Sequence, residues 1–253
     1  MRIVFIGSGN LATRLSLRMK QCGFEILQIY SHTLSNAKIL ASKIECDYTD
    51  SIENINDRAD LYIFSIKDSI LEDVISKVKS NKGIWVHTAG SLSIDVFSKY
   101  KKECGVFYPL QTFSKEKECD FSQIPIFVEG STKDVESKLT KAASRISDKI
   151  YNATSEQRKY LHLSAVFACN FTNHMYAIAE RLLKENNLPF EAIMPLIDET
   201  ALKIKTLSAI KAQTGPAVRK DVNVMGKQIE LLKDEKFKNI YKILSDNIID
   251  FSE

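Results

Sequence analysis

A glycine-rich turn near the start of the chain constrains its fold more than any other feature. Residues 2–6, RIVFI, have the β-branched and aromatic character of a short strand. Six residues follow at once: Gly7, Ser8, Gly9, Asn10, Leu11 and Ala12. An amphipathic run through Leu15 and Met19 then begins without a spacer. Strand, glycine turn and helix in this order are the context that the dinucleotide-binding pattern G-x-G-x-x-G/A requires.

Each small residue of this turn has a physical role in binding a nucleotide. Gly7 permits the tight turn, and Gly9 lacks a Cβ, so a pyrophosphate can approach the backbone. Ala12 lets the helix pack closely on the strand, and the helix N-terminus offers free N–H groups. The alternative is a chance pair of glycines in a strand-to-helix turn. The complete context favours residues 7–12 as the binding site of a pyrophosphate.

Composition excludes several other classes of protein. The 253 residues are 44% hydrophobic and 26% charged, with a net charge of only +3 and no dense basic tract, which argues against nucleic acid. No apolar stretch approaches the roughly 20 residues of a membrane span. Five widely spaced cysteines indicate free thiols in a reducing compartment, and the four histidines lack metal-ligand spacing. We therefore expect a cytoplasmic protein without a metal.

Strand and helix patterns alternate through the first half of the chain. The expected strands are 3–6, 26–30, 61–65, 84–87, 105–108 and 126–129. The expected helices between them are 11–22, 35–43, 70–78, 93–99 and 133–146. Continuous apolar strands separated by helices predict an α/β fold, a doubly wound parallel sheet of the Rossmann type.

The pattern becomes helical throughout after residue 153. One unbroken helix is expected over 155–186, with Ser155 as its cap, and further helices over 189–205, 216–232 and 236–249. We therefore expect a dinucleotide-binding domain over 1–153 and an all-α domain over 154–253.

The end of the second expected strand indicates which dinucleotide binds. NAD-binding folds carry a carboxylate there, which accepts hydrogen bonds from the ribose 2′-OH. Here the strand ends at Tyr30, and Ser31, His32 and Thr33 follow without an acid. Their side chains can donate to a 2′-phosphate that a carboxylate would repel, which favours NADP. The alternative is a loop of small polar residues with no preference.

Two further strand ends are expected to lie beside the nicotinamide. Ser65 and Ile66 follow one strand, and Thr88 and Ala89 follow the next, where small residues let a ring lie against the backbone. The following Gly90 and Ser91 have a purely structural alternative, as a turn and a helix cap. His87 ends a buried strand and is interpreted as a structural histidine.

Polar residues in the helical half are the candidates for substrate chemistry. Asn170, Asn173 and His174 stand in an apolar helical segment, where they either cap neighbouring helices or face the cofactor crevice. Thr214 and Pro216 are explained by the start of a helix. Arg219 is poorly placed for the helix dipole, so it is a candidate to bind a carboxylate or phosphate.

Five motifs in order, GSGNLA, HTAGS, YPLQTF, ACNFTNH and TGPAVRKD, resemble a bacterial family of Rossmann-like NADP oxidoreductases. Its C-terminal helical domain is of unknown function. The chain is more remotely similar to pyrroline-5-carboxylate reductase, deazaflavin-dependent NADP reductases and β-hydroxyacid dehydrogenases. The resemblance implies a C-terminal domain of the 6-phosphogluconate dehydrogenase type, a homodimer formed through it, and residues 170–174 and 214–221 near the nicotinamide.

Two departures from the remote relatives bear on the chemistry. His32 stands where they usually have an arginine, and the long helix lacks the acid/base lysine of the β-hydroxyacid dehydrogenases. The expected function is NADP-dependent hydride transfer to or from a small anionic substrate. Arg219 would anchor its acid group, Asn170 would orient it and His174 would transfer the proton. The alternative is a catalytically silent NADP(H)-binding sensor or interaction protein.

Overall fold

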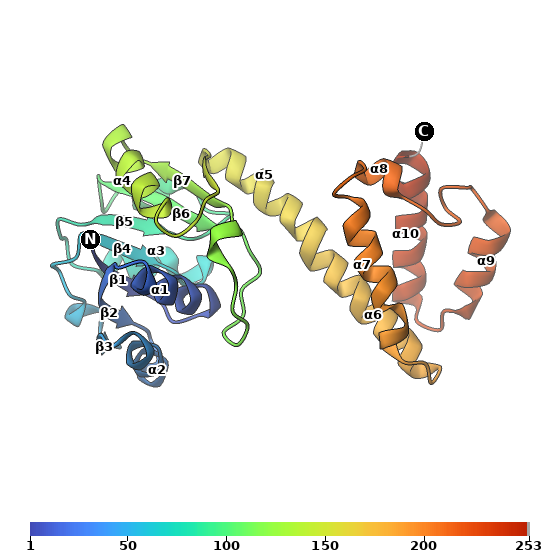
Figure 1. Cartoon of the computed structure of the whole chain (residues 1–253), viewed down its shortest axis with the longest axis horizontal. Coiled ribbons are helices and arrows are strands. Elements are labelled where there is room, and N and C mark those ends of the chain that lie inside the picture. The colour runs from blue at the N-terminus through green and yellow to red at the C-terminus, as the bar shows by residue number, and fades with distance from the viewer. Residues whose placement is uncertain (252–253) are drawn as a thin grey trace. The chain divides into compact units, whose positions relative to one another are not determined.

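The computed structural model describes residues 1–251 of the chain. It divides into two compact units, residues 1–166 and the residues from Phe167 onward (Figure 1).

The first unit is built on an eight-stranded sheet with the order β3-β2-β1-β4-β5-β6-β7-β8. The strands are β1 (Arg2–Ile6), β2 (Glu25–Tyr30), β3 (Asp47–Thr49), β4 (Leu61–Phe64), β5 (Ile84–His87), β6 (Cys104–Pro109), β7 (Ile126–Gly130) and β8 (Ile150–Asn152). The order 3-2-1-4-5 is that of a Rossmann sheet, which confirms the predicted fold class. β1 lies between β2 and β4, so the strand order reverses beside the glycine turn.

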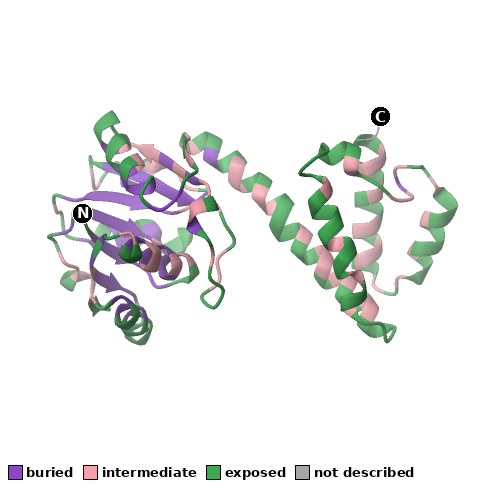
Figure 2. Cartoon of the chain, viewed as in Figure 1, coloured by how far each residue is buried: buried purple, intermediate pink, exposed green. Residues whose placement is uncertain are grey.

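Helices cover both faces of this sheet. They are α1 (Asn10–Gln21), α2 (Leu34–Ile44), α3 (Asp68–Lys77) and α4 (Lys133–Ala143), followed by α5 (Ser155–Ala165). Alternate strand residues point to opposite faces, so Phe5 and Val86 pack with α1, α2 and α4, whereas Val4 and Trp85 pack with α3. The central strands β1, β4, β5 and β6, and β2 beside them, are accordingly buried along most of their length (Figure 2), whereas the edge strands β3 and β8 are mostly accessible.

One strand pair departs from the predicted parallel sheet. β7 runs antiparallel to β6, with Phe107 opposite Val128. The connection between them contains a single short 3-10 turn, Phe121–Gln123, and a parallel pairing would need a longer crossover, usually a helix. The predicted helix over 93–99 is likewise a short 3-10 turn, Ile94–Phe97.

The predicted long helix over 155–186 is interrupted. α5 ends at Ala165, a π-helix spans Val166–Phe171, and α6 (Thr172–Glu185) continues from it. The cap is Thr154, which forms a reciprocal capping box with Gln157, and not Ser155 as predicted. The junction between the two units falls in the π-helix.

The second unit is helical. After α6 it contains a 3-10 turn (Phe190–Ile193), α7 (Met194–Lys203), α8 (Ala209–Ala212), α9 (Val222–Leu231) and α10 (Glu235–Phe251). The helix predicted from 216 begins only at Val222, and Asp221 caps it through the backbone N–H of Val224. Thr214 is therefore not its cap. Residues 216–220 form turns instead, with a left-handed backbone at Lys220 (φ 53°).

Candidate cofactor and active site

The glycine turn has the geometry that its sequence predicts. Gly7 has a φ of 124°, and a Cβ added to it would lie 2.1 Å from the backbone oxygen of Ser65. No other residue fits there, because the conformation and the contact both exclude a side chain. Gly7 therefore lets the chain leave β1 in direct contact with the end of β4.

The N-terminus of α1 is open toward the turn. Gly9 occupies the cap position without a side-chain hydrogen bond, and a Cβ added to it would meet nothing within 4 Å. The first turn of α1 contains no acidic residue. The side chain of Asn10 donates to the backbone oxygen of Phe113 (2.9 Å). Asn10 would therefore bind a ligand through its backbone. Free N–H groups and unfilled space beside Gly9 fit a pyrophosphate.

Backbone hydrogen bonds gather the strand ends at one edge of the sheet. Gly7 donates to the oxygen of Tyr30 (2.8 Å), Ser65 to that of Ile6 (2.8 Å), and Thr88 to that of Phe64 (3.2 Å). The ends of β2, β1, β4 and β5 therefore lie side by side. The structure thus brings together the candidate cofactor residues of the first unit at the carboxyl ends of the strands, where α/β sheets bind ligands.

The end of β2 meets the glycine turn directly. The hydroxyl of Ser8 donates to that of Ser31 (2.8 Å), and both residues are buried. His32 and Thr33 are exposed and precede α2. Because no carboxylate interrupts this segment, it does not repel a 2′-phosphate on an adenosine ribose.

The buried histidine at the end of β5 is structural, as predicted. The backbone N–H of Ala89 donates to His87 Nδ1 (3.1 Å), and Nε2 lies 3.3 Å from the backbone oxygen of Ser93. Burial, reinforced by the nearby charge of Arg158, lowers the pKa of His87 to about 3. A neutral, fully engaged imidazole fixes the loop after β5 and takes no part in proton transfer.

An ion pair that the sequence analysis missed holds this loop from the other side. Arg158 of α5 is 1% exposed and binds Glu129 of β7 at 2.5 Å. Its Nε donates to the oxygen of Ala89 (3.1 Å), and Nη2 donates to the oxygen of Leu92. The same Glu129 carboxylate accepts from the backbone and hydroxyl of Ser155 at 2.9 and 2.7 Å. The start of α5 is therefore fixed to the loop over residues 87–92.

A second pair that the sequence analysis did not single out lies at the same edge. The hydroxyl of Tyr108, at the end of β6, lies 2.9 Å from Nδ1 of His162 on α5. A Cβ added to Gly90 would be 2.6 Å from the His162 ring. The YPLQTF motif and the glycine of HTAGS were signals for these positions, but sequence spacing does not reveal that they meet His162.

The substrate candidates of the helical half lie in the second unit. Asn170 and His174 are exposed, and within residues 1–251 neither forms a side-chain hydrogen bond, so they do not cap helices. The π-helix also departs from the regular α-helical spacing that was expected over this segment. Arg219 is exposed in the turn before α9, and the described residues include no ion pair between it and an acid.

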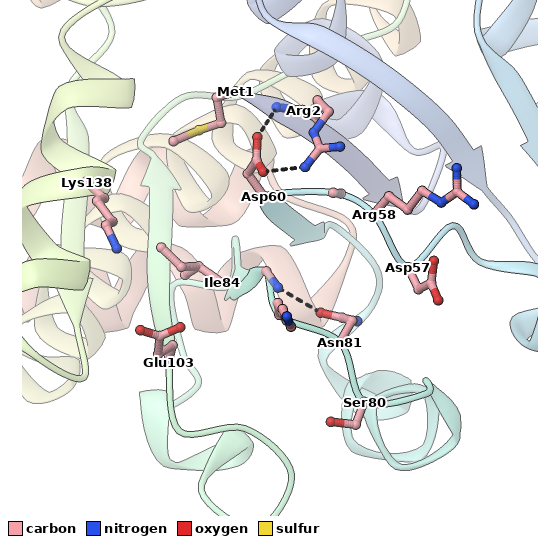
Figure 3. A pocket seen from close by; sticks show the side chains of 13 residues that line it. Met1, Arg2, Asp57, Arg58, Asp60, Ser80, Asn81, Ile84, Glu103 and Lys138 are labelled. Carbon is pink, nitrogen blue, oxygen red and sulfur yellow. Dashed lines mark hydrogen bonds and ion pairs between the residues drawn. The ribbon is translucent and has the colours of Figure 1, made fainter.

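A hollow of about 950 Å³ lies at the opposite, amino edge of the sheet (Figure 3). Arg2 at the start of β1 pairs there with Asp60 at 2.9 Å, and Arg58, Glu103 and Lys138 also line it. Its charges are mixed and it is remote from the glycine turn. The hollow therefore includes none of the candidate cofactor residues, which lie at the carboxyl edge.

Among residues 1–251, no cluster of three or more histidine, cysteine, aspartate or glutamate side chains has the arrangement of a metal site. No helix in the described part of the chain combines the length and apolarity needed to cross a membrane.

Two family models match the chain. Residues 2–89 match the family described as NADP oxidoreductase coenzyme F420-dependent, and residues 124–248 match a domain of unknown function, DUF2520. No curated protein matches the chain.

Solved structures match almost the whole chain. A Bacteroides fragilis protein, named a "putative NADP oxidoreductase", is 47% identical, with a TM-score of 0.92 and 98% coverage of both chains. Protein TM1727 from Thermotoga maritima is 23% identical, with a TM-score of 0.75 and coverage of 99% and 98%. 1-Pyrroline-5-carboxylate reductase from Streptococcus pyogenes is 18% identical, with a TM-score of 0.64 and coverage of 100% and 98%. The chain therefore belongs to the NADP oxidoreductase family that combines this nucleotide domain with a DUF2520 domain.

Proposed function

We propose that this protein is an NADP-dependent oxidoreductase that transfers a hydride to or from a small anionic substrate. The observation that carries the proposal is the open glycine turn beside an acid-free end of β2. NADP is the cofactor of the family, and when bound it supplies the hydride.

The protein's part is to bind and orient the cofactor. Backbone groups of residues 7–12 would hold the pyrophosphate at the N-terminus of α1. Ser31, His32 and Thr33 would bind the phosphate of the adenosine ribose. Ser65 and Ile66 with Thr88 and Ala89 would flank the nicotinamide ribose and ring, at the strand ends that backbone hydrogen bonds bring together.

Three residues of the second unit, Asn170, His174 and Arg219, are the ones proposed to act on the substrate. Arg219 is exposed, so its guanidinium is available to bind a carboxylate in bidentate fashion. Asn170 would orient the substrate's oxygen or nitrogen, and His174 is the candidate from the sequence for the proton. The likeness to a reductase that acts on a cyclic imine acid supports a C=N or C=O substrate with an acid group.

The helical unit would also form a homodimer. Ala217 is the one buried residue of its described part, while Leu196 and Leu231 are 66% and 78% exposed. Helices with an apolar face that nothing covers are typical of subunit interfaces. A second copy of the same unit is the partner that the resemblance to dimeric relatives implies.

Calorimetry with NADPH and NADH tests the cofactor site. We expect NADPH to bind about tenfold more tightly or better, a difference of about 1.4 kcal/mol. Gly9→Ala should weaken NADPH binding by a similar factor without changing the melting temperature, because its Cβ meets no protein atom. Gly226→Ala in α9 is the matched control, since its Cβ also meets nothing within 4 Å.

Two outcomes would contradict the proposal. If neither nucleotide binds at millimolar concentration, the cofactor site is wrong. If NADPH binds but no imine, ketone or aldehyde is reduced, the protein is a nucleotide-binding sensor without turnover.

A further inference from the structure

Among residues 1–251, His162 is the one histidine at the carboxyl edge of the sheet whose ring is hydrogen-bonded at one nitrogen and free at the other. Its Nδ1 lies 2.9 Å from the Tyr108 hydroxyl, and the two rings meet edge to face, 6.2 Å apart at 72°. Within residues 1–251, Nε2 has no hydrogen-bond partner. A ring oriented through one nitrogen presents the other in a defined direction.

The hydrogen bond to Tyr108 can persist in both protonation states of the imidazole. Burial raises the pKa of Tyr108, so its phenol stays protonated and can either donate to Nδ1 or accept from Nδ1–H. When the proton has left Nε2, the neutral ring keeps Nδ1–H, which donates to the phenol oxygen. When the ring is protonated, Nδ1–H donates and the phenol oxygen accepts. The proton that leaves or joins at Nε2 therefore does not release the ring from its position.

Gly90 provides the space in which the ring lies. A Cβ there would be 2.6 Å from both Cγ and Nδ1 of His162 and 2.9 Å from its Cβ. Gly90 has no left-handed backbone to explain it. The absence of a side chain at Gly90 is therefore required by the close approach of the imidazole.

The surrounding elements hold the ring beside the end of β5. Arg158, one turn earlier on α5, binds the oxygens of Ala89 and Leu92, so α5 and the loop after β5 are joined on both sides of Gly90. Val106 of β6 pairs with His87 at the end of β5, and Tyr108 lies two residues after Val106 in the same strand. His162 thus lies against Gly90, which directly follows Thr88 and Ala89, the residues proposed to flank the nicotinamide.

We propose that His162, oriented by Tyr108 and packed on Gly90, is the group that protonates the substrate during reduction. This inference rests on the proposed function and replaces His174 in that role. His174 is exposed and its ring has no hydrogen-bond partner in the described part of the chain, whereas the ring of His162 is fixed.

A hydride from NADPH adds to the carbon of a C=N or C=O bond, and the π electron pair moves to the nitrogen or oxygen. That atom takes the proton from Nε2 of the His162 imidazolium. The products are NADP⁺, the reduced substrate and a neutral His162 whose Nδ1–H still donates to Tyr108. Solvent then returns the proton to Nε2.

The first test asks whether His162 lies beside the bound nicotinamide, and it does not require turnover. Full-length protein labelled with ¹⁵N at histidine is titrated with NADP⁺ and, separately, with adenosine 2′,5′-bisphosphate, which lacks the nicotinamide. The ring signals of His162, assigned by their loss in His162→Gln, should move with NADP⁺ and not with the bisphosphate. If NADP⁺ changes no signal, both the proposed function and this inference are wrong. If NADP⁺ changes other signals but not those of His162, this inference alone is wrong.

The second test measures the proton transfer with two probes, 1-pyrroline-5-carboxylate and its uncharged analogue 1-pyrroline. His162→Gln should lower kcat by about 10²-fold or more, the usual contribution of a general acid, with the Kd for NADPH unchanged. Added imidazole should restore part of the activity of His162→Gly. Gly90→Ala should lower kcat in the same sense by displacing the ring, and Tyr108→Phe should lower it by about tenfold through loss of orientation.

His174→Gln is the matched comparison. If it causes the large loss of kcat and His162→Gln does not, the assignment to His162 is overturned. If neither probe is reduced although NADPH binds, the proposed hydride transfer to a C=N bond is wrong, and so is the proposed role of His162. Arg219→Ala tests the proposed function separately. It should weaken the binding of 1-pyrroline-5-carboxylate, which carries a carboxylate, and not that of 1-pyrroline.

Discussion

The two units of this chain differ sharply in how they bury their apolar side chains. In the first, buried strand residues such as Phe5 and Trp85 pack against helices on both faces of the sheet. In the second, the described residues bury only Ala217, and large apolar side chains such as Leu231 are exposed (Figure 2). A unit that buries little apolar surface gains little stability from it. The first unit therefore carries most of the apolar surface that the described residues bury, and the exposed apolar side chains of the second are the ones that the proposed homodimer would cover.

The largest effect should come from opening the core of the first unit. Trp85→Ala removes a 1% exposed side chain that contacts the rings of Phe64 and Phe97, and should cost about 3–5 kcal/mol of unfolding free energy. Leu231→Ala in the second unit should cost less than about 0.5 kcal/mol in dilute solution. Urea unfolding measures both. An equal loss at Leu231 would mean that α9 is covered even at low concentration.

A buried ion pair in the first unit and an exposed one in the second should differ in the same way in their contribution to stability. Glu129→Ala leaves the buried Arg158 unpaired and should cost about 3 kcal/mol or more. Glu185→Ala removes an exposed partner of Arg181 in α6, a pair at 2.8 Å, and should cost less than about 0.5 kcal/mol. The measurement is again urea unfolding. Similar losses would contradict the burial difference between the two pairs.

Acid should destabilise the first unit through His87. The pKa of this histidine is about 3 in the folded chain and near 6.5 when unfolded, so between these values only the unfolded chain binds the proton. Stability should therefore fall by about 1.4 kcal/mol per pH unit as the pH decreases through this window.

Replacing the buried histidine tests this dependence. His87→Asn should flatten the profile of unfolding free energy against pH between about 6 and 3. His174→Asn, at an exposed position of the second unit, should leave the profile as it is. A slope that survives in His87→Asn would assign the acid sensitivity to other groups.

The smallest effect concerns association of the second unit. Aspartate in turn at Leu196, Leu231 and Ile243 places a charge on α7, α9 and α10. At least one variant should raise the concentration at which the dimer dissociates by about tenfold or more. Ile39→Asp on α2, 59% exposed in the first unit, is the control. Sedimentation measures the mass, and three unaffected variants would exclude a dimer through this unit.

The fold of the first unit was predictable because its signals are local. The glycine turn and the ends of the strands follow from residues that are adjacent in the sequence. Both ends of β5, Ile84 and His87, were predicted correctly. The antiparallel β7 and the π-helix were not predicted, because the first depends on the missing crossover helix and the second on a change of hydrogen bonding within an otherwise helical pattern. The prediction placed the cap one residue too late, at Ser155, because serine and threonine are equally suited by type. The capping box between Thr154 and Gln157 separates the two positions.

The sequence by itself determined the nucleotide fold, the glycine turn and the absence of an acid after β2, since each depends on residues close together in the chain. Only the tertiary structure joined Arg158 to Glu129, 29 residues apart, and Tyr108 to His162, 54 residues apart. Periodicity along one element cannot specify such pairs. They form because the end of β6, the loop after β5 and the start of α5 meet at one edge of the sheet, and that meeting is decided by packing.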